Sequence, residues 1–443
     1  MGASGRAVHL NSSITDAGAA QSRITRYYLD VTGSRFWRVC ADVDPMLIAI
    51  FLPWSTSLVG LMWFLWLIVI LPRIDRDFLQ TLRHPVSLAA IALVGLAAVG
   101  VLWSEGPWGA RISAIAPAAK LLLVPLLFYH YQRSPRAHWV LWGFIGSCTV
   151  LLFCSLTIYV QPGWQPATAH GFDITGVPVR NAIDQNQEFA FCGFVLAWIA
   201  VDAFRKRQVG LAVMLLCLAT LFFANIFFIA LARTSLVYII PLATLFVLGL
   251  FSRKAAAIGL LALVVGVAAL WTTSPYLRGR VANVAVEYQQ YRETNRPTST
   301  GQRLQYWASA VDWIKGAPIF GHGTGATKRL YNQAAEGKAG AWGQRIGNPH
   351  NQLLYVAIEW GLLGCAVLLL LWYQHFQHFR GAGIVAWIGT LVVVQNVLSS
   401  MLNSHIFDFT EGWMYVLGVG VAAGAIRKSS GKSRESANPA EQI

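Results

Sequence analysis

The stretch VGLAVMLLCLATLFFANIFFIA, residues 209–230, contains no charged residue over its 22 positions. After Leu-Ala-Arg at residues 231–233, a second apolar stretch follows, TSLVYIIPLATLFVLGLF, residues 234–251. A helix needs about 20 apolar residues to cross the ~30 Å of hydrocarbon in a bilayer. The two stretches therefore predict two membrane-spanning helices with one arginine, Arg233, between them.

The same pattern recurs along the 443 residues, of which 56% are hydrophobic and only 12% are charged. A soluble domain has about 25% charged residues, so this chain has too few of them to form the water-exposed surface of a soluble protein. We expect an all-α polytopic membrane protein. The twelve predicted spans are 36–53, 56–72, 86–103, 113–131, 137–160, 186–203, 209–230, 234–251, 255–272, 351–374, 382–401 and 411–426.

The distribution of basic residues predicts the orientation of these spans. With the N-terminus inside, the short loops on the opposite face hold only Arg111, Arg180 and Arg233. Each short loop on the inner face holds as many basic residues as the neighbouring outer loops, or more, as the positive-inside rule requires. Their basic residues are Arg73, Arg76, Arg83, Arg133, Arg136, Arg205, Lys206, Arg207, Arg253, Lys254 and Arg380. Merging the first two spans would break this alternation, so we expect both termini in the cytoplasm. The net charge of +14 needs no nucleic-acid partner.

The predicted organisation has five parts. Residues 1–35 form a cytoplasmic tail, 36–272 hold the first nine spans, 273–350 form an external helical loop domain, 351–426 hold three spans, and 427–443 form a second cytoplasmic tail. The polar N-terminal region lacks a short apolar core before a cleavage site, so we expect no cleavable signal peptide.

The long external loop carries two helical patterns. Apolar residues recur at three- and four-residue steps from Val281 to Tyr291 and again from Leu304 to Ile314. Ser299 and Gln302 have the spacing of a capping box, which predicts the start of the second helix. Arg303 then falls in its first turn, where free amides and the helix dipole already favour an anion. A guanidinium adds a planar fork that matches phosphate oxygens.

Three other residues on the predicted outer face suggest a site. Arg233 and Arg180 lie at span ends near the membrane surface, where a charge needs water, a partner or a ligand. His350 lies where the loop domain re-enters the membrane, and a partly shielded imidazole can stay neutral and accept a proton. Together with Arg303, these residues predict a site for a membrane-anchored diphosphate.

These residues resemble the O-antigen ligase and polymerase superfamily of bacterial inner membranes. The likeness is sharpest from about Arg180 to Gly364 and includes the loop segment from Arg303 to Gly325. Its most specific part is His350-Asn351, nine residues, then Gly361-Leu-Leu-Gly364, which looks like the ligase branch.

The resemblance implies a membrane glycosyltransferase of the type C class. Family ligases move a glycan from undecaprenyl diphosphate to a sugar hydroxyl of lipid A–core at the periplasmic face. Arg233, Arg303 and His350 match the family's essential arginines and histidine, and Arg180 matches more loosely; Asn351, Gly361 and Gly364 would support them. The implied partners are the lipid-linked donor, the lipid A–core acceptor and membrane lipids.

We expect a reaction that inverts the anomeric centre and uses neither a cofactor nor a metal. The Asp-x-Asp pairs that could bind a metal, Asp42-Val-Asp44 and Asp75-Arg-Asp77, both lie on the predicted cytoplasmic side. Two alternatives stay open: an O-antigen polymerase or protein oligosaccharyltransferase with the same donor, and a lipid-linked-oligosaccharide flippase. The His-Asn-x9-Gly-x-x-Gly pattern argues against the first. The absence of an internal repeat, together with Lys120 as the only charge well inside a span, argues against the second.

Overall fold

The computed structural model describes residues 33–161, 163–164 and 176–437, and every element assigned in these ranges is a helix. The longer helices before the external loop are α2 (Arg35–Phe51), α3 (Thr56–Ile70), α5 (Pro85–Val99), α8 (Leu123–Tyr131), α9 (Ala137–Val160), α10 (Ala182–Arg205), α11 (Val209–Phe228), α12 (Ser235–Leu250) and α13 (Arg253–Thr273). The later ones are α14 (Pro275–Thr294), α15 (Ser299–Gly316), α16 (Ala326–Ala335), α17 (Gln352–His378), α18 (Ile384–Ser399) and α19 (Phe409–Ala437). Short helices are η1 (Leu71–Arg73), α4 (Asp77–Leu82), α6 (Trp108–Ser113), α7 (Ala116–Ala119), η2 (Lys120–Leu122) and η3 (Gly340–Gly343).

The all-helical polytopic fold predicted from the sequence is confirmed, since each of the twelve predicted spans coincides with a helix or a helical run. Eight of these in the described residues are long and apolar enough to cross a membrane. The apolar helices α5, α12 and α18 are shorter, and α2 supplies the twelfth segment. The fourth span is a broken run from Trp108 to Tyr131 that joins α6, α7, η2 and α8.

The two predicted tails are only partly described. Residues 1–32 of the tail predicted over 1–35, and 438–443 at the other end, lie outside the described residues. The last span was predicted to end at 426, but helix α19 continues to Ala437. The boundary at 427 therefore does not end the helix.

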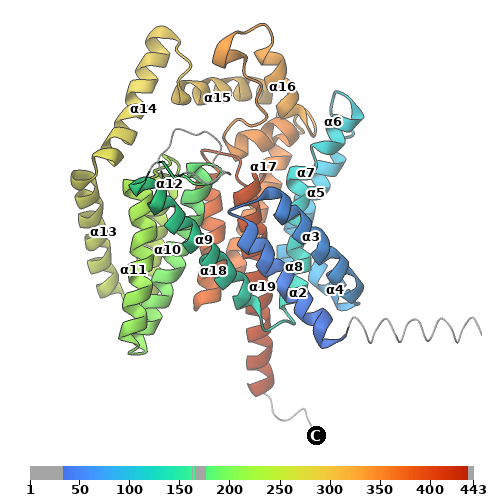
Figure 1. Ribbon diagram of the computed structural model, residues 1–443. Helices are drawn as coiled ribbons and strands as arrows, with labels where there is room; N and C mark the ends of the chain where they lie inside the picture. The colour runs from blue at the N-terminus through green and yellow to red at the C-terminus, as the bar shows by residue number, and fades with distance from the viewer. Residues whose placement is uncertain (1–32, 162, 165–175, 438–443) are drawn as a thin grey trace, which may run out of the picture.

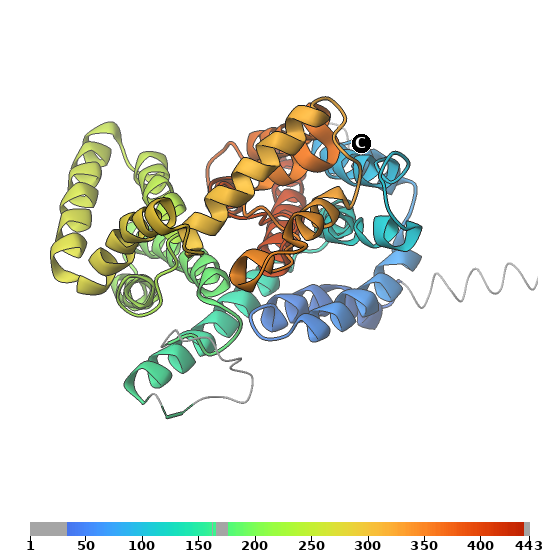
Figure 2. The same ribbon diagram turned by 90° about the horizontal axis from the view of Figure 1, so that it is seen from above.

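The external loop lies at one end of the bundle. Figure 1 shows α14, α15 and α16 together at this end, whereas the C-terminal part of α19 extends from the opposite end. Seen from above in Figure 2, α15 crosses over the bundle from the side of α13 and α14 toward α17. Below it, α10 packs closely on α11, α19 on α8, and α17 on α5. The loop helices thus cover the ends of the membrane helices.

The two helices predicted in the loop are present as α14 and α15, with one correction to the start of α15. Its N-cap is Thr298, whose hydroxyl accepts a hydrogen bond from the Gly301 amide at 3.1 Å, rather than Ser299. Arg303 is consequently the fifth residue of α15 and lies beyond the first turn. Its predicted position beside the free amides of the helix start is wrong.

A break in α17 joins the loop domain to the membrane helices. Gly361 has φ +61° and ψ −153°, so the helix is interrupted there. The segment that follows α15 fits into the break: the Leu362 amide donates to the Pro318 carbonyl at 2.8 Å, and the His322 amide donates to the Ile358 carbonyl at 2.8 Å. A Cβ at Gly361 would collide with the Ile319 backbone, which explains the glycine.

The end of the same segment is tied to α17 by a buried carboxylate. Glu359 accepts hydrogen bonds from the Gly325 amide at 2.9 Å and the Thr327 amide at 3.2 Å, and so caps the start of α16. Gly321 is needed here as well, because a Cβ on it would lie 2.5 Å from the Glu359 carbonyl carbon. Close backbone contact therefore explains three glycines, Gly321, Gly323 and Gly361.

Candidate functional site

Arg233 lies in a short non-helical segment between α11 and α12. Asn186 of α10 fixes this segment, because its side chain bonds the Ala230 carbonyl at 2.5 Å and the Ala232 amide at 3.1 Å. The guanidinium of Arg233 forms a bidentate ion pair with Glu287 of α14, with Nη1 at 2.8 Å from Oε2. Arg233 is therefore already paired with a carboxylate of the loop domain.

Glu287 also occupies the N-terminus of α15. Its Oε2 accepts hydrogen bonds from the Thr300 amide at 3.0 Å and the Thr300 hydroxyl at 2.6 Å. Hydrogen bonds from Arg233 above all, and from Thr300, lower the pKa of Glu287 to about 2. The anion predicted at the start of this helix is thus present as a side chain of the protein itself. Sequence spacing did not reveal it, because Glu287 lies on a different helix.

Arg303 lies close to this pair and to His350, but it is not paired itself. Its side chain forms no hydrogen bond or ion pair with the described residues, although Arg233 and Glu287 both act on it electrostatically. Burial, reinforced by the charge of Arg233, lowers its pKa below the ordinary arginine value. A partly buried guanidinium without a partner is costly unless an anion or water neutralises it.

His350 precedes α17 and is held by two asparagines. Its Nδ1 lies 2.8 Å from Asn403 Oδ1, and its backbone amide donates to Asn348 Oδ1 at 2.8 Å. The ring of Tyr306 stacks on the imidazole with centroids 6.3 Å apart. Because Asn403 presents an oxygen, Nδ1 carries the hydrogen and Nε2 keeps a free lone pair.

The surroundings of His350 keep its ring neutral. Burial lowers the pKa of His350 below its ordinary value of 6.5, and the nearby charge of Arg303 acts in the same direction. The hydrogen bond with Asn403 opposes this shift only in part. A neutral imidazole with one free nitrogen is the form needed to accept a proton near pH 7.

Arg180 approaches the same region from the start of α10. Its Nη1 bonds the Thr410 hydroxyl and lies 3.7 Å from the Asp184 carboxylate, and its guanidinium lies over the Phe409 ring at 5.0 Å. The other terminal nitrogen, Nη2, is buried and has no hydrogen-bond partner in the described chain. Arg180 is thus partly paired and keeps one donor free.

Backbone strain coincides with two of these positions. Arg180 has φ +59° and His350 has φ +55°, and only four described residues other than glycine have positive φ. Such conformations cost about 1–3 kcal/mol each and concentrate at functional sites. The strain is consistent with a requirement to aim these two side chains.

A polar cavity of about 280 Å³ joins these elements. Residues from the starts of α10, α17 and α19 surround it, including His350, Asn403 and Asp184. Arg180 reaches this cavity's wall through its bond to Thr410, which also lines it. The structure thus brings His350 close to Arg180 and Arg303, and Arg303 links them to Arg233 electrostatically.

The cavity wall contains acidic residues that were not predicted from the sequence as part of the site. Asp408 and Glu411 follow α18, and their carboxylates, with the His405 ring, lie within 4.8 Å of one another. Burial raises the pKa of Asp408 and lowers that of His405 to about 4. The polar run from Asn403 to Asp408 between two apolar spans is the sequence signal that could have identified them.

The cluster of His405, Asp408 and Glu411 has ligand types that could hold a metal. It already has a cation beside it, because the Lys120 ammonium donates to the carbonyls of Phe407, at 3.2 Å, and of Asp408. Lys120 also acts electrostatically on both carboxylates. An ammonium at this distance opposes binding of a second cation.

The residues predicted to support the site have structural roles. Asn351 is the N-cap of α17: its side chain accepts from the Leu354 amide at 3.1 Å and donates to the Met401 carbonyl at 2.9 Å. Gly361 forms the break described above, and Gly364 lies against the side chains of Trp360 and Val356. These residues hold His350 and the loop domain in position rather than line the cavity.

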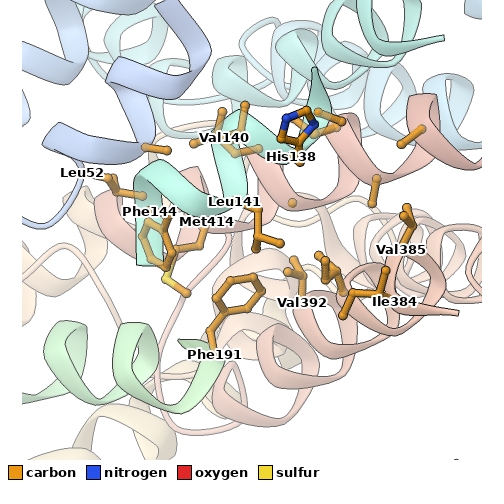
Figure 3. A pocket seen from close by; sticks show the side chains of 18 residues that line it. Leu52, His138, Val140, Leu141, Phe144, Phe191, Ile384, Val385, Val392 and Met414 are labelled. Atoms are coloured by element: carbon orange, nitrogen blue, oxygen red, sulfur yellow. The ribbon is translucent and has the colours of Figure 1, made fainter. Parts of the chain in front are cut away.

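An apolar cavity of about 170 Å³ lies deeper among the membrane helices (Figure 3). Side chains of α2, α9, α18 and α19 surround it, with Phe191 from α10. Phe191, Val392 and Met414 also line a smaller cavity, which in turn shares Glu411 with the polar cavity at His350. Neighbouring cavities therefore lead from the apolar interior of the bundle to the candidate site.

Residues 218–369 match the family described as O-antigen ligase. This region contains Arg233, Arg303 and His350, together with Glu287. The match confirms the resemblance found in the sequence to the O-antigen ligase superfamily over residues 218–369, about a third of the chain. Together with the eight apolar candidate spans, the match indicates an integral membrane protein.

One relative extends this comparison without adding a function. An uncharacterized protein of Haemophilus influenzae is 33% identical over 166 residues. The aligned region covers 36% of this chain and 41% of that protein, so the two match over less than half of either length.

Proposed function

We propose that this protein transfers an O-antigen glycan from undecaprenyl diphosphate to a sugar hydroxyl of lipid A–core at the periplasmic face of the inner membrane. The observation that carries the proposal is the arrangement around His350, which lines the polar cavity: Arg180 bonds Thr410 in the cavity wall and Arg303 acts electrostatically on His350, and both guanidinium groups have unused donors. The proposal also rests on the match to the O-antigen ligase family.

The arginines would act on the leaving group. As the bond between the anomeric carbon and the diphosphate breaks, negative charge grows on the phosphate oxygens. Donors fixed beforehand stabilise that charge more in the transition state than in the substrate. Arg303 and the free Nη2 of Arg180 are such donors, and Arg233 becomes a third when the diphosphate replaces the Glu287 carboxylate.

His350 would act on the acceptor. Its free Nε2 takes the proton from the sugar hydroxyl as the oxygen attacks the anomeric carbon from the side opposite the diphosphate. The new glycosidic bond forms as the bond to the carrier breaks, so the anomeric configuration inverts. Asn403 holds the ring in the required tautomer through Nδ1.

The apolar cavities support a lipid-linked donor. The smaller one adjoins the polar cavity through Glu411, and the larger one is lined by side chains such as Phe144, Phe191 and Met414 (Figure 3). An isoprenoid chain can lie in such surroundings while its diphosphate remains at the membrane surface with the arginines. We propose a metal-independent reaction, because the guanidinium groups can supply the positive charge and Lys120 lies beside the only group of three candidate metal ligands found in the described residues.

The function is tested by transfer in vitro from a defined glycan on undecaprenyl diphosphate to purified lipid A–core. We expect a product of one glycan on each acceptor, formed equally well in excess chelator, with inverted anomeric configuration by NMR. Extension of the donor's own glycan would instead indicate a polymerase, and transfer to a peptide would indicate an oligosaccharyltransferase. Transport across vesicles without transfer would indicate a flippase, and loss of activity in chelator would contradict metal independence.

Replacing Glu287 by glutamine is expected to lower the KM for the lipid-linked donor by up to about tenfold, with kcat little changed. The carboxylate competes with the donor diphosphate for Arg233, and an ion-paired hydrogen bond contributes about 1.5–3 kcal/mol. Glutamine keeps the length of the side chain and an oxygen for the Thr300 amide.

The matched control is Glu293→Gln, because Glu293 lies on the same helix and is exposed. Initial rates over a range of donor concentrations measure the effect. A raised KM for Glu287→Gln would show that the ion pair positions Arg233 and is not displaced by the donor.

A further inference from the structure

A second polar cavity, of about 330 Å³, lies at the end of the bundle opposite α15. It is formed by the start of α2, the end of α3 with η1, and the connection from α8 to α9. Beside the cavity, the Lys428 ammonium of α19 donates a hydrogen bond to the Arg133 carbonyl at 2.8 Å. The distribution of basic residues predicts that this end faces the cytoplasm. The proposed transfer reaction makes no use of this cavity.

The lining of this cavity is strongly basic. Four arginines contribute to it, Arg38, Arg73, Arg133 and Arg136, against two carboxylates, Asp42 and Asp75. The volume is at the lower end of the range of about 300–1,000 Å³ for small-ligand sites. The lining therefore carries an excess of two positive charges when His130 is neutral.

Both carboxylates are already paired. Buried Asp42 bonds Arg136 Nη1 at 2.8 Å, His130 Nε2 at 2.8 Å and the Ser134 hydroxyl at 2.5 Å. Asp75 pairs with Arg133 at 3.3 Å. These contacts fix the wall of the cavity, and neither carboxylate forms a hydrogen bond with Arg38 or Arg73, although the charge of Asp42 acts on Arg73.

Arg38 and Arg73 are the two arginines left over. Neither guanidinium forms a hydrogen bond or salt bridge with the residues that the structure describes, and Nη1 of Arg73 is buried without a partner. Tyr129 fixes the backbone of Arg73, because its hydroxyl donates to the Arg73 carbonyl at 2.9 Å. Arg38 is exposed and Arg73 is half-buried, and both line the cavity; orientation of the chain in the membrane requires neither a cavity nor a buried unpaired nitrogen.

We propose that this cavity binds a phosphate group, held by Arg38 and Arg73. Guanidinium groups match phosphate oxygens with paired hydrogen bonds, and two unpaired arginines neutralise the charge of one phosphate group. Two sources share this chemistry. One is the headgroup of an anionic phospholipid, which basic pockets between membrane helices recognise at the cytoplasmic surface. The other is a free phosphate compound of the cytoplasm.

The test compares two double variants of the full chain purified in detergent. Arg38→Gln with Arg73→Gln removes both unpaired arginines, whereas Arg35→Gln with Arg76→Gln removes the same charge from exposed neighbours outside the cavity lining. Binding of phosphatidylglycerol is measured by native mass spectrometry, and binding of inorganic phosphate by the shift of the unfolding temperature. Equal unfolding temperatures without ligand check that both variants fold.

We expect binding to be at least about tenfold weaker in the Arg38/Arg73 variant and less than about twofold weaker in the control. The reason is that each charge-assisted hydrogen bond lost costs more free energy than a tenfold change in affinity represents. Loss of lipid binding alone identifies the headgroup as the source, and loss of phosphate binding alone identifies a free phosphate compound. Equal affinities in wild type and the Arg38/Arg73 variant for both ligands would overturn the proposal.

Discussion

Replacing His350 by alanine is expected to lower the rate of glycan transfer by about 10²- to 10⁴-fold, the usual contribution of a positioned general base. The loss should appear in kcat, because the imidazole accepts a proton only as the acceptor attacks. Donor binding should change little, since the diphosphate is held by the arginines. Single-turnover transfer with both substrates saturating measures this step directly.

The pH dependence of the wild type gives an independent check. Burial lowers the pKa of His350 below 6.5, so the ring is neutral at higher pH and becomes protonated only as the pH falls through that lowered value. Transfer should therefore be fastest at and above neutral pH and should fall to half its maximum only at a pH below 6.5.

Asn403→Ala is the matched control for His350→Ala. It leaves the imidazole in place but removes its orienting hydrogen bond, so the loss should be smaller. Because that bond raises the pKa of His350, the acid limb should also move to lower pH. A His350→Ala enzyme with normal kcat would remove His350 from the role of base.

Replacing Arg303 by alanine is expected to lower kcat by about 10²- to 10³-fold, as does loss of one preorganised donor to a developing oxyanion. Arg303 should have the largest effect of the three arginines, because its guanidinium has no other partner in the described chain. Transfer rates with the defined lipid-linked donor measure it.

Two further variants separate the geometry of Arg303 from its charge. Arg303→Lys keeps the charge but not the planar fork, and it should recover only part of the rate. Arg292→Ala removes a charge from exposed α14 and should transfer glycan at the wild-type rate. Equal losses in Arg292→Ala and Arg303→Ala would mean that only the net charge of the loop domain matters.

The fold followed from hydrophobic length and loop charge, because a membrane helix satisfies its backbone internally and so its existence is a local property. The stretches 209–230 and 234–251 coincide with α11 and α12 to within a few residues. Boundaries set by tertiary contacts were missed. The start of α15 depends on its cap Thr298, whose hydroxyl also donates to the Glu287 carbonyl of α14 at 2.9 Å.

The candidate site was only partly predictable, for a related reason. Arg180, Arg233 and His350 were singled out from their places at span ends and at the membrane re-entry of the loop, whereas Arg303 was singled out from a place at a helix start that is wrong. Their partners were not recognisable, because pairing depends on which helices meet. Glu287, for example, reaches Arg233 across 54 residues of chain.

The break in α17 has a consequence for how a long lipid-linked glycan could enter. Main-chain hydrogen bonds join the segment 317–323 to α17 on both sides of Gly361, and we call this the clamped side of the loop domain. It cannot move away from the membrane helices without breaking those hydrogen bonds. Helix α14, in contrast, buries only Leu277. The Arg233–Glu287 ion pair also holds α14, but the proposed donor would displace it, so we expect a movement that admits the carrier to pivot on the clamped side and open on the α14 side. Cross-linking α14 to α11 should therefore prevent entry of the lipid-linked donor and stop glycan transfer. Cross-linking the segment 317–323 to α17 should leave transfer unchanged.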